Sequence, residues 1–158
     1  MKSTQDNTAN EIRKYCYSLL NHRDYTKAEL YKKLTARGYH TEDIEAELLR
    51  LTDLGLIDDR RVARLLLSHY ENSRCLGIFA CKHELKTRGI DRQIIDELVF
   101  TPQREMEKAL KAVNKKTTHL KKYPIYVKLK KMYELLSRKG FDNETILQVL
   151  KQYKEETQ

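Results

Sequence analysis

Basic side chains recur at helical intervals between positions 104 and 139, and tyrosines are interleaved with them. The cations at 104, 108, 111, 115 and 122 are three, four or seven residues apart, which places them on one face of a helix, opposite an apolar stripe that includes Met106 and Val113. Cations attract the phosphates of a nucleic acid, and tyrosine rings beside them can stack on unpaired bases. The candidate nucleic-acid-binding residues are Arg104, Lys108, Lys111, Lys115, Lys122, Lys128, Lys131, Arg138 and Lys139, and the candidate stacking residues are Tyr123 and Tyr126.

Two plainer interpretations of the same residues stay open. A lysine-rich helix face usually contacts only water, and tyrosines often pack between helices with the hydroxyl group at the surface. The charge distribution favours binding, because residues 102–140 hold twelve Lys or Arg and three Glu, a net charge of +9, whereas the whole chain has +8. Positive charge concentrated in one segment is what attraction to a polyanion requires.

The sequence contains no recognisable pattern of catalytic or metal-ligating residues. The five histidines are scattered, and the pair Asp58-Asp59 has no third ligand at a suitable spacing, so helix capping explains it best. Motifs of serine hydrolases, phosphate loops and dinucleotide-binding sites are also missing. We therefore expect a protein that is not an enzyme and that needs no cofactor or metal.

Cysteine usage and hydropathy indicate the compartment. The three cysteines, Cys16, Cys75 and Cys81, are odd in number and lack CxxC spacing, which is typical of small core residues in a reducing compartment. No apolar run is long enough to cross a membrane, and the polar N-terminus does not resemble a signal peptide. We expect a cytoplasmic protein that does not bind membranes.

A five-residue motif that occurs three times, at intervals of 51 residues, indicates the helices that would position the basic residues. Its copies are Leu34–Gly38, Leu85–Gly89 and Leu136–Gly140. A leucine, a cation in the last turn and a left-handed glycine are typical of a helix C-terminus. A capping residue follows each copy (Thr41, Asp91 and Asn143) and predicts the start of another helix. A capping box that begins at Thr26 predicts one more helix start.

Together with helical periodicity elsewhere, these signals predict an all-α fold of three tandem three-helix repeats. Repeats of this length bury their apolar faces mainly against neighbours, so we expect an elongated array, and elongated surfaces usually bind other polymers. The expected boundaries are a polar N-terminal tail at 1–10, repeat 1 at 11–56, repeat 2 at 57–100 and the basic repeat 3 at 101–156.

Several motifs recur in a characteristic order between about residue 11 and residue 155. They are Arg23-Asp24-Tyr25-Thr26 followed by Glu29-Leu30 and Lys33-Leu34, then Gly55-Leu56-Ile57-Asp58-Asp59 with Ala63 one turn on, then Gly77 leading to Glu84-Leu85-Lys86-Thr87-Arg88-Gly89-Ile90, and finally Arg138-Lys139-Gly140-Phe141. In this order and at these intervals, they resemble the RecX family, the bacterial regulators of the RecA recombinase.

The resemblance implies a curved, right-handed array of three-helix units that binds along the groove of the RecA nucleoprotein filament. It also implies a regulator that modulates, mainly by inhibition, the strand-exchange, ATPase and co-protease activities of RecA in DNA repair, recombination and the SOS response. The expected partners are the RecA filament, single-stranded DNA and, secondarily, double-stranded DNA. The protein itself is expected to be a monomer.

The residues by themselves leave two other functions open. Helix pairs joined by short turns also occur in helix-turn-helix proteins that read a DNA sequence, although the positive charge here extends over a long helix and its neighbour rather than one short recognition helix. The other alternative is a protein-only helical scaffold whose basic end binds an acidic protein.

Overall fold

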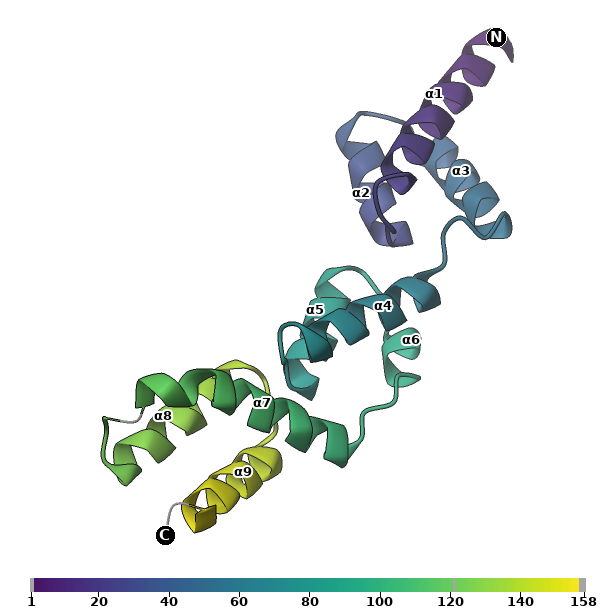
Figure 1. The fold of residues 1–158 in the computed structure, drawn as a ribbon. Coiled ribbons are helices and arrows are strands. Elements are labelled where there is room, and N and C mark those ends of the chain that lie inside the picture. The colour runs from purple at the N-terminus through teal and green to yellow at the C-terminus, as the bar shows by residue number, and fades with distance from the viewer. Residues whose placement is uncertain (1, 121, 157–158) are drawn as a thin grey trace. The chain divides into compact units, whose positions relative to one another are not determined.

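The computed structural model describes the backbone of residues 2–120 and 122–156, with side chains for 7–116, 120 and 122–156. Every regular element in these ranges is an α-helix, so the prediction of an all-α fold is confirmed (Figure 1). None of the described helices is long and apolar enough to cross a membrane.

The helices fall into three consecutive groups of three. They are α1 (Lys2–Leu20), α2 (Lys27–Ala36), α3 (Thr41–Asp53), α4 (Asp59–Asn72), α5 (Ile78–Thr87), α6 (Arg92–Asp96), α7 (Pro102–Leu120), α8 (Ile125–Arg138) and α9 (Asn143–Glu156). One boundary differs from the prediction, because α1 begins at Lys2, inside the expected polar tail at 1–10. Apart from Met1, which lies outside the described residues, that segment therefore belongs to the first helix.

The glycines of the three repeated motifs end helices, as the sequence predicts. Gly38, Gly89 and Gly140 have left-handed φ angles of 83°, 77° and 78°, and the backbone N–H of each donates to the carbonyl three residues earlier. Residues with a side chain rarely adopt this conformation, so glycine lets the chain leave the helix here. The interval of 51 residues reflects three equivalent turns between the second and third helices of the groups.

Helix caps were predicted only in part. The capping box at Thr26 and the cap at Asp91 are confirmed by side-chain hydrogen bonds to backbone N–H groups. Thr41 is instead the first residue of α3, which has no side-chain cap. Asp142, not Asn143, caps α9, since its Oδ1 accepts the backbone N–H three residues on at 2.8 Å. Where two adjacent residues can both cap, local sequence does not choose between them.

The helices pack into two compact units. The first comprises the chain up to Leu65 together with Lys86–Ile95, so it contains α1 to α3, the start of α4, the end of α5 and most of α6. Its buried core is formed by Ile12, Cys16, Tyr25, Leu30, Leu34, Ile44, Leu48, Leu51 and Ile57. The three helices of the first group thus bury their apolar stripes against one another.

The second unit comprises Leu66–Leu85 and the chain from Asp96 onward. Its core is formed by Cys75, Ala109, Ala112, Val113, Leu120, Met132, Leu136, Phe141, Ile146 and Val149. The division runs through predicted repeat 2 at 57–100, because that repeat contributes helices to both units. All three cysteines are buried and free, which confirms the prediction that they are core residues.

Candidate nucleic-acid interface

Helix α7 lies with its apolar stripe in the core of the second unit, as its periodicity predicts. Val113 is buried there, and Met106 is partly buried against the same core. On the other side of the helix, Lys111, Lys115 and Lys116 are exposed. The helix therefore presents cations to solvent, which is the orientation that binding to a polyanion requires.

Lys108 does not share this orientation, and its place among the candidate binding residues is corrected. Only 7% of the residue is exposed. Its Nζ donates to Glu71 Oε1 on α4 at 3.1 Å and also to Glu105 Oε1. Burial by itself would lower the pKa of Lys108, but the hydrogen bonds and charges of Glu105 and Glu71 outweigh it and raise the pKa. A lysine that is buried and paired with two carboxylates is not available to a phosphate.

Three other lysines surround the loop that follows α4. Lys111 Nζ donates to the last carbonyl of α4 at 3.1 Å. Lys139 Nζ donates to the Arg74 carbonyl at 2.6 Å. Lys115 Nζ lies 3.8 Å from Cys75 Sγ. Carbonyl groups at a helix C-terminus have no partner within the helix and carry the negative end of its dipole, so they attract cations. This loop gathers lysines from α7 and from the end of α8 at one place.

The ammonium group of Lys139 experiences the combined positive potential of this region. Burial lowers the pKa of Lys139, and the charges of Lys115, Arg74 and Arg138 lower it further, against an opposing effect of Cys75. Arg74 is partly neutralised by Glu84 at 3.3 Å. An anion placed here would be attracted by several cations at once.

A surface pocket of about 300 Å³ continues the basic surface between α7 and α8. Three cations line it: Lys116, Lys131 and Arg138. Glu134 is the one acidic side chain among its lining residues. The pocket is shallow and its lining has a net positive charge, which suits a phosphate group better than an uncharged ligand.

The two candidate stacking residues differ in their surroundings. Tyr123 packs against the core of the second unit, and the Nζ atoms of Lys122 and Lys131 lie 5.5 and 5.1 Å from its ring centroid. Tyr126 is 70% exposed. Tyr123 therefore holds two lysines beside its ring by cation–π attraction, and Tyr126 is the tyrosine with a free face.

Two further sequence candidates stand apart from this group. Arg104 is exposed in the first turn of α7, and Lys128 is half-buried near the start of α8. Neither residue is among the described residues that line the pocket between α7 and α8. Their assignment to a binding surface stays a prediction.

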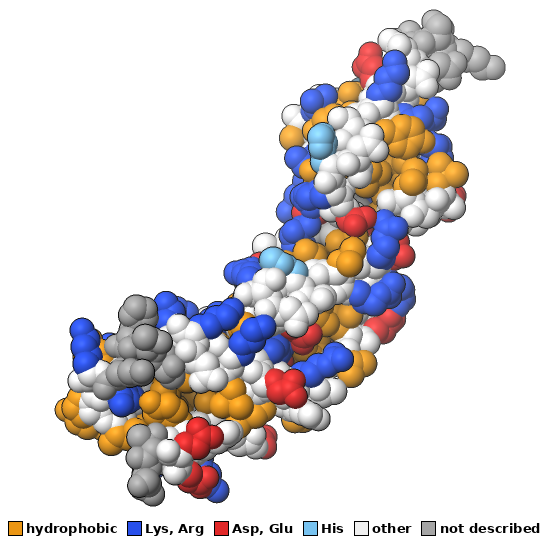
Figure 2. Space-filling view, in the orientation of Figure 1, with side chains coloured by type: hydrophobic (Ala, Val, Ile, Leu, Met, Phe, Trp, Pro, Cys, Tyr) orange, Lys and Arg blue, Asp and Glu red, His pale blue; other side chains and the backbone are white. Residues whose placement is uncertain are grey.

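The connected cations form a surface that we call the basic strip. Its members are Arg74, Lys111, Lys115, Lys116, Lys122, Lys131, Arg138 and Lys139. Figure 2 shows Lys and Arg side chains close together over the α7 part of this unit. Sequence reasoning omitted Arg74 and Lys116. Lys116 lies within the basic run and could have been included, whereas Arg74 lies in a loop between helices and has no signal in the sequence.

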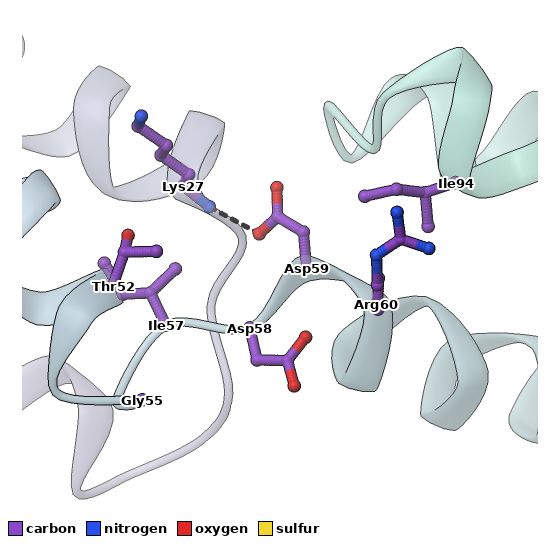
Figure 3. Close-up of a pocket in the computed structure, with 8 residues that line it drawn as sticks. All are labelled: Lys27, Thr52, Gly55, Ile57, Asp58, Asp59, Arg60 and Ile94. Carbon is purple, nitrogen blue, oxygen red and sulfur yellow. Dashed lines mark hydrogen bonds between the residues drawn. The ribbon is translucent and has the colours of Figure 1, made fainter.

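The pair Asp58-Asp59, in the first unit, caps helices and lines a pocket of about 400 Å³ (Figure 3). Asp58 Oδ1 accepts the Arg61 backbone N–H at 3.0 Å, and Asp59 Oδ1 accepts the Lys27 backbone N–H at 2.9 Å. Burial raises the pKa of Asp59, against the effect of the Lys27 N–H. In the described ranges, no three His, Cys, Asp or Glu side chains lie close enough to hold a metal ion. Both carboxylates thus have structural partners, as the capping interpretation predicts.

Comparisons with known proteins identify the family. A model of the first three-helix domain of RecX matches residues 13–51, and a model of the third matches residues 103–150. A protein named Regulatory protein RecX from Chlorobium phaeobacteroides (strain BS1) is 33% identical over 152 residues, which cover 96% of this chain and 97% of that protein. A protein of the same name from Prosthecochloris aestuarii (strain DSM 271 / SK 413) is 31% identical over 133 residues, covering 81% of this chain and 83% of that protein.

Solved structures show the same fold. The crystal structure of RecX from Lactobacillus salivarius matches with a TM-score of 0.81 over 96% of this chain and 97% of that chain, at 23% sequence identity. The two matched family domains fall within α1 to α3 and α7 to α9, so the predicted tandem three-helix repeats are confirmed. This chain belongs to the RecX family of regulatory proteins.

Proposed function

We propose that this protein regulates the RecA recombinase by binding to the RecA nucleoprotein filament, with the basic strip in contact with DNA phosphates. Its relatives are named regulatory proteins, and the family resemblance implies RecA as the regulated partner. The observation that carries the proposal is the convergence of eight cations on one surface, from α7, α8, the residues that follow these two helices and the loop after α4.

The proposed effect is inhibition of RecA strand exchange and of the ATPase and co-protease activities that depend on the filament. The regulator acts in the cytoplasm as a monomer, in DNA repair, recombination and the SOS response, and it catalyses no reaction itself. Its contribution is binding energy, because an ordered row of cations can occupy phosphates that the filament would otherwise present to other partners.

Electrostatics predicts how binding responds to salt. Each phosphate that a lysine or arginine neutralises releases condensed counterions, so affinity falls as the salt concentration rises. If about five members of the strip contact phosphates, affinity for bare single-stranded DNA should fall roughly 10²-fold to 10³-fold between 50 and 200 mM salt. The exposed ring of Tyr126 adds a stacking surface for unpaired bases, which favours single strands.

The test is a RecA-dependent ATPase and strand-exchange assay with the purified regulator at sub-stoichiometric amounts. A strip variant replaces five exposed cations: K115Q, K116Q, K122Q, K131Q and R138Q. We expect this variant to bind single-stranded DNA with a strongly reduced salt dependence and to inhibit RecA at least tenfold less well.

A matched control removes five exposed lysines from other surfaces of the chain: K14Q, K32Q, K86Q, K151Q and K154Q. Both variants have the same net charge, so any difference between them reports the position of the charges and not their number. Equal potency of the two variants would show that the basic strip is not the contact surface. Wild-type protein without any effect on RecA would refute the proposed function itself.

A further inference from the structure

The start of α2 packs closely on the turn between α5 and α6, and all the residues involved belong to the first unit. Thr26 Oγ1 donates to the Arg88 carbonyl at 2.7 Å. A Cβ atom added to Gly89 would lie 2.3 Å from the methyl group of Ala28. The first backbone N–H of α2 donates to Asp59 Oδ1, on α4, at 2.9 Å. The contact therefore requires glycine in the turn and a small residue in the helix.

The start of α5 packs in the same way on the turn between α8 and α9, within the second unit. The backbone N–H of Gly77 donates to the Lys139 carbonyl at 2.9 Å. A Cβ atom added to Gly140 would lie 2.5 Å from Ala80. The first backbone N–H of α5 donates to Glu105 Oε2, on α7, at 3.0 Å. We call each of these two contacts a glycine joint.

The two glycine joints share four features. Each turn has a glycine with positive φ, and each docked helix has an alanine at its second or third position. A donor just before the helix, a hydroxyl or a backbone N–H, bonds to the carbonyl that precedes the glycine. A carboxylate from the first helix of the following group accepts the first N–H of the docked helix. The same requirements are thus met twice by different residues.

The Gly38 turn, between α2 and α3, has the same backbone but no docked helix. Its φ of 83° is close to those of Gly89 and Gly140, yet nothing lies within 4 Å of an added Cβ. Tyr39, which follows the glycine, is half-buried, whereas the equivalent Ile90 and Phe141 are each 4% exposed. Among the described residues, no backbone N–H donates to the carbonyl groups of Arg37 and Gly38.

A second copy of this chain cannot fill the Gly38 turn with its own free helix start. The helix that would do so is α8, the second helix of the third group. Pro124, just before it, has no N–H to donate. Tyr126 and Val127 occupy its second and third positions, whereas alanine occupies the second position at the Gly89 turn and the third at the Gly140 turn. Tyr126 would collide with the turn in the first arrangement and Val127 in the second, at the distances found there.

We propose that the Gly38 turn is a docking position for the start of a helix on a partner protein. The partner helix has alanine, glycine or serine at its second or third position and a hydroxyl or backbone N–H donor just before it. The position stays open to such a partner because Pro124, Tyr126 and Val127 prevent copies of this chain from joining head to tail. The docking position does not involve the basic strip and does not depend on the proposed function.

The test changes the start of α8 so that it can dock on the Gly38 turn of another copy of the chain. The triple variant P124G/Y126F/V127A reproduces the sequence Gly77-Ile78-Phe79-Ala80 at the start of α8. The triple variant P124T/I125K/Y126A reproduces Thr26-Lys27-Ala28 there. Sedimentation equilibrium measures the mass of each against concentration. We expect the wild type to stay monomeric and each triple variant to form head-to-tail oligomers whose mass rises with concentration.

The G38A substitution, added to each triple variant, should return it to a monomer, because the new methyl group would occupy the space of the docked alanine. G55A is the matched control, since Gly55 has a positive φ of 69° and nothing within 4 Å of its added Cβ, but lies outside the joint. Triple variants that are folded by circular dichroism yet monomeric, or association that survives G38A, would overturn the proposal. Wild-type association that G38A abolishes would overturn the role of Pro124, Tyr126 and Val127.

Discussion

Replacing Lys108 and replacing Lys115 should have opposite consequences, although both lie on the face of α7 that the spacing marks as basic. Lys108→Gln removes a buried cation, and Lys115→Gln removes an exposed one. We expect Lys108→Gln to lose stability and keep its affinity for single-stranded DNA. Lys115→Gln should lose affinity and keep its stability.

The magnitude for Lys108→Gln follows from its partners. Lys108 and Glu105 are 7% and 4% exposed, and the Glu71 side chain is 12% exposed. Removing the ammonium group leaves the buried Glu105 and the largely buried Glu71 carboxylates without their cation, which should reduce the free energy of unfolding by about 3–5 kcal/mol. An exposed residue such as Lys115 contributes within about 0.5 kcal/mol. The two variants should therefore differ in stability by several kcal/mol.

Urea unfolding followed by circular dichroism measures the stability difference. Fluorescence anisotropy with a labelled oligonucleotide measures affinity, and loss of one phosphate contact should weaken binding roughly fourfold at 0.15 M salt. A Lys108→Gln variant that unfolds at the same urea concentration as the wild type would refute the buried-pair argument. So would a folded Lys108→Gln variant that loses as much DNA affinity as Lys115→Gln.

The pKa of Lys108 adds a pH dependence to this comparison. Because the folded protein raises that pKa, the stabilisation is fully present below the ordinary lysine value of 10.5 and is lost as the pH rises through the higher folded value. The wild type should therefore lose more stability than Lys108→Gln in alkaline urea titrations. Parallel losses in the two proteins would contradict the expected direction.

Four further substitutions test the glycine turns and the helix caps. Gly55→Ala should reduce the free energy of unfolding by about 1–2 kcal/mol because of its left-handed backbone alone. Gly89→Ala should reduce it more, because its new Cβ would lie 2.3 Å from Ala28. Thermal unfolding compares the two variants, and equal losses of stability would argue against the close contact. Thr26→Ala should lower the free energy of unfolding by about 1–2 kcal/mol. The reason is that the hydroxyl caps α2 and also donates to a carbonyl of the α5–α6 turn. An unchanged urea midpoint would contradict this expectation. Burial would raise the pKa of Asp142, but hydrogen bonds from the start of α9 outweigh burial and lower the pKa. The ionised Asp142 therefore stabilises the fold fully above the ordinary pKa of 3.8, and this stabilisation is lost as the pH falls through the lower folded value. Asp142→Asn should therefore differ from the wild type at neutral pH and converge with it in acid, as urea titrations at the two pH values would show.

The sequence alone determined the helices, their glycine ends and their grouping into repeats. These features depend on residues within a few positions of one another, so a leucine, a cation and a glycine at a fixed spacing are enough to indicate a helix end. The capping box at Thr26 was readable for the same reason. The cap of α9 was not, because Asp142 and Asn143 are adjacent and both can serve.

Only the tertiary structure decided which cations face solvent and which glycine turns are occupied. Lys108 and Lys115 have equivalent places in the helical pattern, but Glu71 of α4 lies against Lys108 and makes it part of the core. Arg74 joins the basic strip because its loop folds against the end of α8. Gly38 and Gly89 end their helices in the same way, and only Gly89 has a helix docked on it. Burial and pairing of a charge are set by neighbours that are distant in the sequence, and a local pattern holds no information about them.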